Sequence, residues 1–506
     1  MKLHKILLAS LVLLSPIAAK AQTEAAAVSR DSVMAVINAA KDSDPEALNN
    51  LGVWYYNGEN VERDYTTAAR MFAKAASLGN VEAIANLGLC YRYGNGVEQD
   101  SVRAMGLYER SLREGNTTLL AELKADADKG DIFACAAAAH FFNNGIGTAR
   151  DYAQAANYYS RLARKDKTNT TAVRQAGVAY LNAKDYKKAL EWLRKGALAG
   201  DTVCEYYYGS MLVEGLGGTQ DFATGFVYAM NAAEDGNANA MYLVARLYRE
   251  GKGVNVSTTQ ANEWLAKAAY LGLPKAIYDY ALVAVEKNEI IEAAYLFSWL
   301  QARNSFVQQV KALFDEKNDN NILSTPFGHY TLAISAIAAG DFKTAKNEIK
   351  ALKKAKIALA DVLEAQILLS PANEKRDVAK AVKQLTKIAG KNAYAAYTLG
   401  LIYERGAENL EPDPEKALEY LTMAADADFI LAGDALGNAY YEGSFGARDA
   451  ALARKAYEAQ NARGIMLATS ASRYASSIQD TDAALAKKVA SMKYPESLDS
   501  YLAITK

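Results

Sequence analysis

Cysteine, histidine and proline are all scarce in this sequence of 506 residues, which has 3 cysteines, 3 histidines and 8 prolines. Cys90, Cys135 and Cys204 fall in three separate helical stretches. An odd number of cysteines with this spacing predicts free, buried thiols rather than a disulfide framework. No Cys-x-x-Cys pair is present, and only His140 and His329 lie beyond the first 21 residues. The sequence therefore predicts no metal site.

Charge of one sign and long apolar runs are also lacking. The chain has 57 Lys and Arg against 58 Asp and Glu, a net charge of -1, so it has no basic surface of the kind that binds nucleic acid. With 51% hydrophobic and 23% charged residues, the composition excludes a disordered chain, a collagen-like chain and a polytopic membrane protein. Few prolines, 32 tyrosines and abundant alanine indicate closely packed helices.

The motifs of well-known catalytic sites are missing as well. The sequence has no Gly-x-Ser-x-Gly elbow, no P-loop and no His-Glu-x-x-His motif. The segments 94–96 and 251–253 have the glycine content of phosphate-binding loops, but they recur between predicted helices without a preceding strand. We interpret both as turns, and we predict no catalytic residue and no cofactor.

The N-terminus has the three parts of a secretory signal peptide. Lys2 and Lys5 form a basic region, residues 6–14 form an apolar region, and Ala19-Lys20-Ala21 is a typical cleavage site. An uncleaved anchor is the alternative, but a span needs ~20 apolar residues and this run is shorter. We expect cleavage after residue 21, export to a periplasm or beyond, and no stable membrane insertion of the mature chain.

An internal repeat is the strongest positive signal in the sequence. The pattern Leu-Gly-x-x-Tyr-x-x-Gly begins at Leu51 and again at Leu87, 36 residues later. A second pair of the same pattern begins at Leu399 and Leu436, with an offset of 37. The spacing of 36 also separates three glycines, Gly200, Gly236 and Gly272.

Each repeat is predicted to form two helices. A glycine within the first helix, such as Gly52, costs ~1 kcal/mol relative to alanine, so it predicts a close approach of a neighbouring helix. A second glycine, such as Gly58, ends this helix in a turn that requires a positive φ. An aspartate follows at the position where the next helix needs an N-cap acceptor. These aspartates are Asp64, Asp100, Asp151, Asp221, Asp413 and Asp449.

The complete pattern resembles the Sel1-like repeat, a glycine-rich relative of the tetratricopeptide repeat. Residues 83–115 fit it best, whereas Ala139 and Ala245 replace the glycine within the first helix. Residues 171–200 and 274–304 lack the glycine-rich turn and look more like plain tetratricopeptide units. The resemblance implies an all-α fold, an α-solenoid of helix pairs that mediates protein–protein or peptide contacts.

The distribution of repeats predicts how the chain is organised. Two insertions, near 116–131 and 305–328, interrupt the series. The last segment should form a cap, because the terminal units of a solenoid must present a polar outer face. The predicted segments are an N-terminal segment at 22–43, a solenoid of about seven helix pairs at 44–304, an irregular tetratricopeptide-like region at 305–392, further Sel1-like repeats at 393–462 and a helical cap at 463–506.

Candidate binding residues follow from the resemblance. In tetratricopeptide-like units the residues at -3, +1, +4 and +5 from the glycine position of the first helix point into a concave groove. Tyr206, Tyr242 and Tyr278 occupy -3 in three repeats, and Arg246 and Arg249 stand beside them. Tyrosine and arginine often dominate binding energy at interfaces. The alternative, that these tyrosines pack between helices, stays open. The tyrosines at +3 are interpreted as core residues; they are Tyr55, Tyr91, Tyr180, Tyr248, Tyr403 and Tyr440.

Two functions are compatible with these features. The favoured one is an exported scaffold that binds a protein or peptide partner in its concave groove. The alternative is a cell-wall or β-lactam-related enzyme or binding protein on the same fold. Some cysteine-rich members of the family are associated with β-lactams, but the cysteine pairing of those members is absent here. We therefore predict a binding protein that is not an enzyme and has no nucleic-acid partner.

Overall fold

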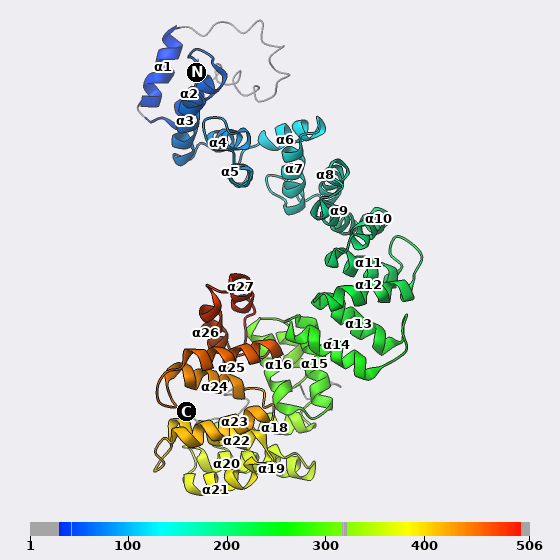
Figure 1. The fold of residues 1–506 in the computed structure, drawn as a ribbon, viewed down its shortest axis with the longest axis vertical. Coiled ribbons are helices and arrows are strands. Elements are labelled where there is room, and N and C mark those ends of the chain that lie inside the picture. The colour runs from blue at the N-terminus through cyan, green and yellow to red at the C-terminus, as the bar shows by residue number, and fades with distance from the viewer. Residues whose placement is uncertain (1–29, 42, 316, 318–320, 497–506) are drawn as a thin grey trace. The chain divides into compact units, whose positions relative to one another are not determined.

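The computed structural model describes residues 30–41, 43–315, 317 and 321–496. These residues form 27 α-helices in a repeating arrangement and no β-sheet (Figure 1). The predicted α-solenoid fold is confirmed. The predicted signal peptide at 1–21 lies outside the described residues. None of the helices in the described part combines the length and the apolar character that crossing a membrane requires.

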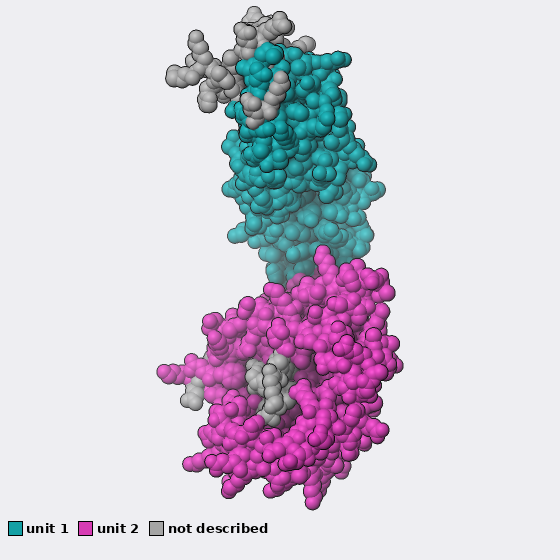
Figure 2. Space-filling model, turned by 90° about the vertical axis from the view of Figure 1, so that its left-hand side faces the viewer, with its two compact units in different colours: residues 1–231 teal, residues 232–506 magenta. Residues whose placement is uncertain are grey.

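The chain divides into two compact units, coloured separately in Figure 2. Unit 1 is residues 1–231, unit 2 is residues 232–506, and the division falls within α12 (Phe222–Glu234). The preceding helices of unit 1 are α1 (Arg30–Lys41), α2 (Pro45–Asn57), α3 (Tyr65–Ser77), α4 (Val81–Tyr93), α5 (Ser101–Arg113), α6 (Leu119–Asp128), α7 (Ile132–Asn144), α8 (Tyr152–Lys165), α9 (Thr170–Asn182), α10 (Tyr186–Leu198) and α11 (Thr202–Glu214).

The helices of unit 2 that follow the division continue the series of pairs. They are α13 (Ala238–Glu250), α14 (Thr258–Tyr270), α15 (Pro274–Glu286), α16 (Ile290–Ala302), α17 (Val307–Ala312), α18 (Pro326–Ala338), α19 (Phe342–Lys354), α20 (Leu359–Leu369), α21 (Val378–Ala389), α22 (Ala393–Arg405), α23 (Pro414–Asp426), α24 (Ala432–Glu442), α25 (Ala450–Arg463), α26 (Ala468–Ile478) and α27 (Ala483–Ser491).

A recurring aspartate begins the second helix of many pairs. The carboxylate of Asp100 accepts a hydrogen bond from the backbone N–H of Arg103 at 2.8 Å, which satisfies an amide that the helix start leaves free. The backbone N–H of Asp100 donates to the carbonyl of Tyr91 at 2.9 Å and closes the turn. The predicted N-caps are confirmed, because the same side-chain bond is made by Asp64, Asp100, Asp151, Asp221, Asp413 and Asp449.

The glycine within the first helix makes room for a ring from the second. A Cβ atom added to Gly88 would lie 2.7 Å from two ring carbons of Tyr108, and Gly52 faces Phe72 in the same way. Both rings are buried. The predicted close approach therefore occurs, and it brings a large aromatic side chain directly onto the backbone of the partner helix.

The three cysteines all lie in the described part of the chain, and each is buried with a free thiol, as predicted. Cys204 packs against Gly196, where a larger side chain would collide with its sulfur. Burial raises the pKa of Cys90 to about 12, so its thiol stays protonated. The cysteines therefore act as small core residues.

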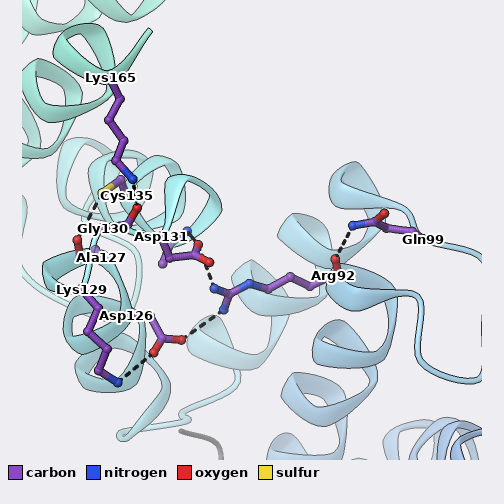
Figure 3. A network of polar contacts seen from close by, with 10 residues as sticks. Arg92, Gln99, Asp126, Ala127, Lys129, Gly130, Asp131, Cys135 and Lys165 are labelled. Atoms are coloured by element: carbon purple, nitrogen blue, oxygen red, sulfur yellow. Dashed lines mark hydrogen bonds and ion pairs between the residues drawn. The ribbon is translucent and has the colours of Figure 1, made fainter. Parts of the chain in front are cut away.

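Residues 116–131, predicted as an insertion, form α6 and the turns around it. Buried Arg92 of α4 reaches this segment (Figure 3). Its Nη2 lies 2.8 Å from Asp131 Oδ1, and its Nη1 lies 3.4 Å from Asp126 Oδ2. The guanidinium also covers the ring of Phe133, 5.1 Å from the centroid. One cation thus ties α4 to α6 and α7.

Within unit 2, the C-terminal segment packs back onto α16. The hydroxyl of Tyr295 accepts a hydrogen bond from the backbone N–H of Met466 at 3.0 Å and donates to its carbonyl at 3.1 Å. Trp299 stacks on Tyr494 at 5.1 Å, and its Nε1 donates to the carbonyl of Met492 at 3.3 Å. We call these bonds the C-terminal contact. They join residues 171 and 193 positions apart in the sequence.

Candidate binding groove

A groove in unit 1 crosses α2, α4 and α6 and the turns before them, with a volume of about 480 Å³. Its lining includes residues at the repeat positions that are expected to face a concave groove. Asn49, Val53 and Tyr56 stand at -3, +1 and +4 from Gly52. We call it the asparagine groove, because its lining includes Asn49, Asn50, Asn57, Asn80, Asn86 and Asn116.

Hydrogen bonds between successive repeats run along the asparagine groove. Asn86 Nδ2 donates to Asn49 Oδ1 at 2.9 Å, and Asn95 Nδ2 donates to the hydroxyl oxygen of Tyr56 at 2.6 Å. Burial raises the pKa of Tyr56 to about 12, so this hydroxyl keeps its proton and can itself donate. Each asparagine amide offers two donor hydrogens and an acceptor oxygen, and these pairings use only part of that capacity.

The charged groups that line the asparagine groove are all acidic. They are the carboxylates of Asp44, Glu46, Glu82 and Glu122, and no lysine or arginine occurs among the described lining residues. Glu122 is half-buried. Its burial, with the charge of Asp126 nearby, raises its pKa. The groove therefore favours a ligand that carries positive charge.

The predicted groove tyrosines lie on three helices and are all half-buried. Tyr206 is on α11 in unit 1, whereas Tyr242 and Tyr278 are on α13 and α15 in unit 2. The hydroxyl of Tyr242 donates to Asp279 Oδ2 at 2.8 Å. Tyr278 stacks on Phe306, with the ring centroids 5.5 Å apart. Each of these two rings thus already contacts a neighbouring element of its own unit.

The two predicted arginines lie on α13 beside Tyr242. Arg246 is half-buried and Arg249 is exposed. Burial raises the pKa of Tyr242 to about 12, and the two guanidinium charges oppose that rise. Tyr206 packs against Tyr207 of its own helix, with the ring centroids 4.9 Å apart. The structure therefore brings Tyr242 and both arginines together, and their binding role stays a prediction.

The tyrosines at +3 make a common contact in several repeats. A cation three residues after the N-cap aspartate lies over the ring, at 4.4 to 5.2 Å from the centroid. Such cation–π contacts contribute ~0.5–1 kcal/mol at exposed sites, and they support a structural role for these tyrosines. The pairs are Arg103 with Tyr91, Lys188 with Tyr180 and Lys416 with Tyr403.

In the described part of the chain, neither His140 nor His329 belongs to a metal-binding cluster. Among the described residues, no group of three or more His, Cys, Asp or Glu side chains is arranged to hold a metal ion. His329 Nδ1 lies 2.6 Å from Glu348 Oε2, and His140 Nε2 lies 3.5 Å from Glu109 Oε2.

The groove asparagines were not singled out from the sequence, although a signal for them was present. Asn49 stands at -3 from Gly52, the same position that identified the tyrosines of later repeats. Applying that rule to the first repeat would have found Asn49 and Tyr56. Asn86 stands at -2 from Gly88, so the rule misses it by one position.

Comparisons with known proteins agree with the repeat architecture. Seven segments match the Sel1 repeat family: residues 45–80, 81–116, 132–167, 176–201, 202–237, 238–273 and 393–429. The first of these spans α2 and α3, one complete helix pair. A comparison with curated proteins gives no match.

Solved structures that match this chain include two bacterial proteins. One is a protective antigen present in uropathogenic Escherichia coli strains that displays an SLR (Sel1-like repeat) fold; it is 21% identical, covering 93% of this chain and 96% of that one, with a TM-score of 0.33. The other is a Sel1 repeat protein from Oxalobacter formigenes; it is 23% identical, covering 47% of this chain and 92% of that one, with a TM-score of 0.26.

Proposed function

The chain belongs to the Sel1 repeat family, and from this premise we propose that it is an exported scaffold that binds an extended polypeptide in the asparagine groove. Helical scaffolds of this family typically mediate protein–protein interactions. The observation that carries the proposal is the set of asparagine amides on α2 and α4 and in the turns before α4 and α6, within a lining whose charged groups are all acidic.

Asparagine side chains suit the recognition of a polypeptide backbone. An amide side chain presents the same donor and acceptor groups as a peptide bond, so it can pair with a backbone without reading its sequence. The hydrogen bond between Asn86 and Asn49 fixes two such amides in one orientation, which lowers the entropy lost on binding. The four carboxylates then favour a segment rich in lysine or arginine.

Photo-crosslinking tests the location of the binding surface. A benzophenone amino acid at Val53, in the asparagine groove, should form adducts with proteins of the exported fraction, because it faces the bound segment. The matched control is Val102 of α5, which is 85% exposed and outside the groove lining. Adducts from the Val102 position with none from the Val53 position would refute the groove.

The tyrosine positions are a second candidate surface for the same function. Replacing Tyr206, Tyr242 and Tyr278 together by alanine should weaken partner capture and barely change the melting temperature if the rings are exposed to a ligand. If the rings serve packing, each truncation should cost ~3–5 kcal/mol. Such a loss of stability would come from removing the contacts of Tyr242 with Asp279 and of Tyr278 with Phe306. A clearly lower melting temperature of the triple variant therefore excludes a groove role for these tyrosines.

Export is the part of the proposal that rests on the sequence alone. Cleavage after Ala21 should give a mature protein that begins at Gln22. N-terminal sequencing of the protein from the periplasm or medium measures this directly, and a retained Met1 would contradict cleavage. The alternative of a β-lactam-related enzyme has no observation in its favour, and Sel1-repeat folds are generally non-catalytic.

A further inference from the structure

Unit 2 contains a second cavity, separate from the asparagine groove, with a volume of about 770 Å³. It lies among the turns that lead into α16, α20, α22 and α24 and the turn that follows α25. This volume is within the range of ligand-binding pockets, about 300–1,000 Å³. We call it the turn cavity.

One part of the turn cavity is acidic. Glu289 and Glu292 lie one helical turn apart at the start of α16, and both line the cavity. The hydroxyl of Tyr270 donates a hydrogen bond to Glu292 and fixes its carboxylate. Burial is the largest cause of a raised pKa at Glu292, and the neighbouring Glu289 carboxylate adds to it. A bound cation would oppose this rise in pKa, since it would stabilise the ionised form of the pair.

Another part of the lining is basic. Lys356 and Lys391 line the cavity at the turns before α20 and α22, and neither is paired with a carboxylate among the described residues. Arg463 is held in place, because its Nη2 donates to the carbonyl of Asp428 at 3.1 Å. The N-cap of α20, Ala358, supplies no side-chain hydrogen bond, and in the first turn of that helix the backbone N–H of Ala360 donates to the carbonyl of Ile357 at 3.1 Å. Free amides at a helix start attract an anion.

The lining is therefore balanced, with three acidic and three basic side chains: Glu289, Glu292, Asp428, Lys356, Lys391 and Arg463. A simple cation or anion would satisfy only one of the two groups. A zwitterion satisfies both, and the volume exceeds the needs of a single amino acid. Isoleucine and leucine side chains in the same lining offer apolar contact, among them Ile290, Ile357 and Leu359.

We propose that the turn cavity binds a short peptide with free termini, whose ammonium group meets Glu289 and Glu292 and whose carboxylate meets Lys356, Lys391 and the start of α20. This site takes the two ends of a peptide, whereas the asparagine groove takes the middle of a chain. The two proposals therefore use different residues in different units and can fail independently.

Calorimetric titration of the full mature chain with trialanine tests this site. Trialanine should bind, and both its N-acetylated form and its C-terminal amide should bind at least about tenfold more weakly, because each lacks one terminal charge. Absence of binding at millimolar trialanine, or equal binding of the blocked forms, would overturn the proposal.

Two variants assign the ends of the peptide. Glu292→Gln should weaken trialanine and the amide but leave the acetylated form unchanged. Lys391→Met should weaken trialanine and the acetylated form but leave the amide unchanged; Lys391 is exposed, so this variant should fold normally. Glu82→Gln in the asparagine groove is the matched control and should bind all three peptides like the parent protein. A loss caused by Glu82→Gln would place the peptide in the other unit and refute the turn cavity.

Discussion

At the residue scale, two helical glycines in unit 1 have opposite surroundings. A Cβ added to Gly88 would lie 2.7 Å from the ring of Tyr108, whereas a Cβ added to Gly106 of α5 would meet nothing within 4 Å. Glycine costs about 1 kcal/mol relative to alanine in a helix, so the space around each residue decides the effect of adding a methyl group.

Gly88→Ala should therefore destabilise unit 1 by about 1–3 kcal/mol, because the ring must move out of a packed position. Gly106→Ala should stabilise it by up to about 1 kcal/mol. Urea unfolding followed by circular dichroism measures both. Equal shifts in the two variants would show that helix propensity, and not the ring, decides the effect.

Asp434 of α24 gives a pH dependence. The carboxyl accepts hydrogen bonds from Gln460 Nε2 at 3.2 Å and from the backbone N–H of Leu467 at 3.3 Å, yet burial raises its pKa to about 6. The folded state therefore binds more protons than the unfolded state between about pH 4 and pH 6. This contribution stabilises the fold at low pH and is lost as the pH rises through 6.

Asp434→Asn should remove the contribution of this carboxyl to the pH dependence of stability, since asparagine does not titrate. Relative to the variant, the parent protein should lose roughly 2 kcal/mol of unfolding free energy between pH 4 and pH 6. Denaturant unfolding at a series of pH values gives the difference. A constant difference across this range would mean that the carboxyl titrates as it does in water.

The sequence predicted the backbone roles of single residues better than their binding roles. Asp100 and Gly52 were placed correctly because N-caps and close approach depend on neighbours within one repeat. The surroundings of Tyr242 and Tyr278 depend on Asp279 and Phe306, which belong to later turns and helices. A rule based on position within a repeat does not contain that information.

At the element scale, α6 shows how an insertion is joined to a solenoid. Leu119, Leu123 and Ala127 recur every four residues and are all buried, so a helix pattern was present in the sequence. This helix has no repeat signature, because it lies between two repeats, at 81–116 and 132–167. The bonds from Arg92 to Asp126 and Asp131 supply the connection instead.

Arg92→Met should loosen α6 while keeping the apolar part of the side chain. Losing one partner of a buried ion pair costs about 3–5 kcal/mol, and we expect the lower end because both carboxylates are partly exposed. Hydrogen exchange should become faster in α6. Arg110→Met, which breaks an exposed pair with Glu114, is the control and should cost below about 1 kcal/mol. Unchanged exchange in α6 would contradict the connecting role of Arg92.

At the scale of the whole molecule, the two units differ in the range of their contacts. In unit 1, the helices with substantial contacts pack on the next helix or the next but one. In unit 2, the C-terminal contact joins α16 to residues 466 and 492. The sequence predicted a terminal cap at 463–506, but periodicity carries no information about which distant helix such a segment covers.

Tyr295→Phe should destabilise unit 2 by about 2 kcal/mol or more, because it leaves the buried N–H and C=O of Met466 without a partner. Tyr494→Phe is the matched control; it keeps the stacking on Trp299 and should change the stability little. Thermal unfolding of both variants measures the difference. Equal melting temperatures would show that the contact contributes nothing to stability.

The C-terminal contact also has a mechanical consequence. In a solenoid whose helices pack only on near neighbours, each repeat is held by local contacts alone. Such a solenoid should therefore extend under tension in small, reversible steps. In unit 2, force applied between residue 270 and the end of α27 acts against the bonds of Tyr295 and Trp299. This stretch should therefore resist extension and then release in one abrupt step, whereas the α2–α11 stretch of unit 1 should yield gradually.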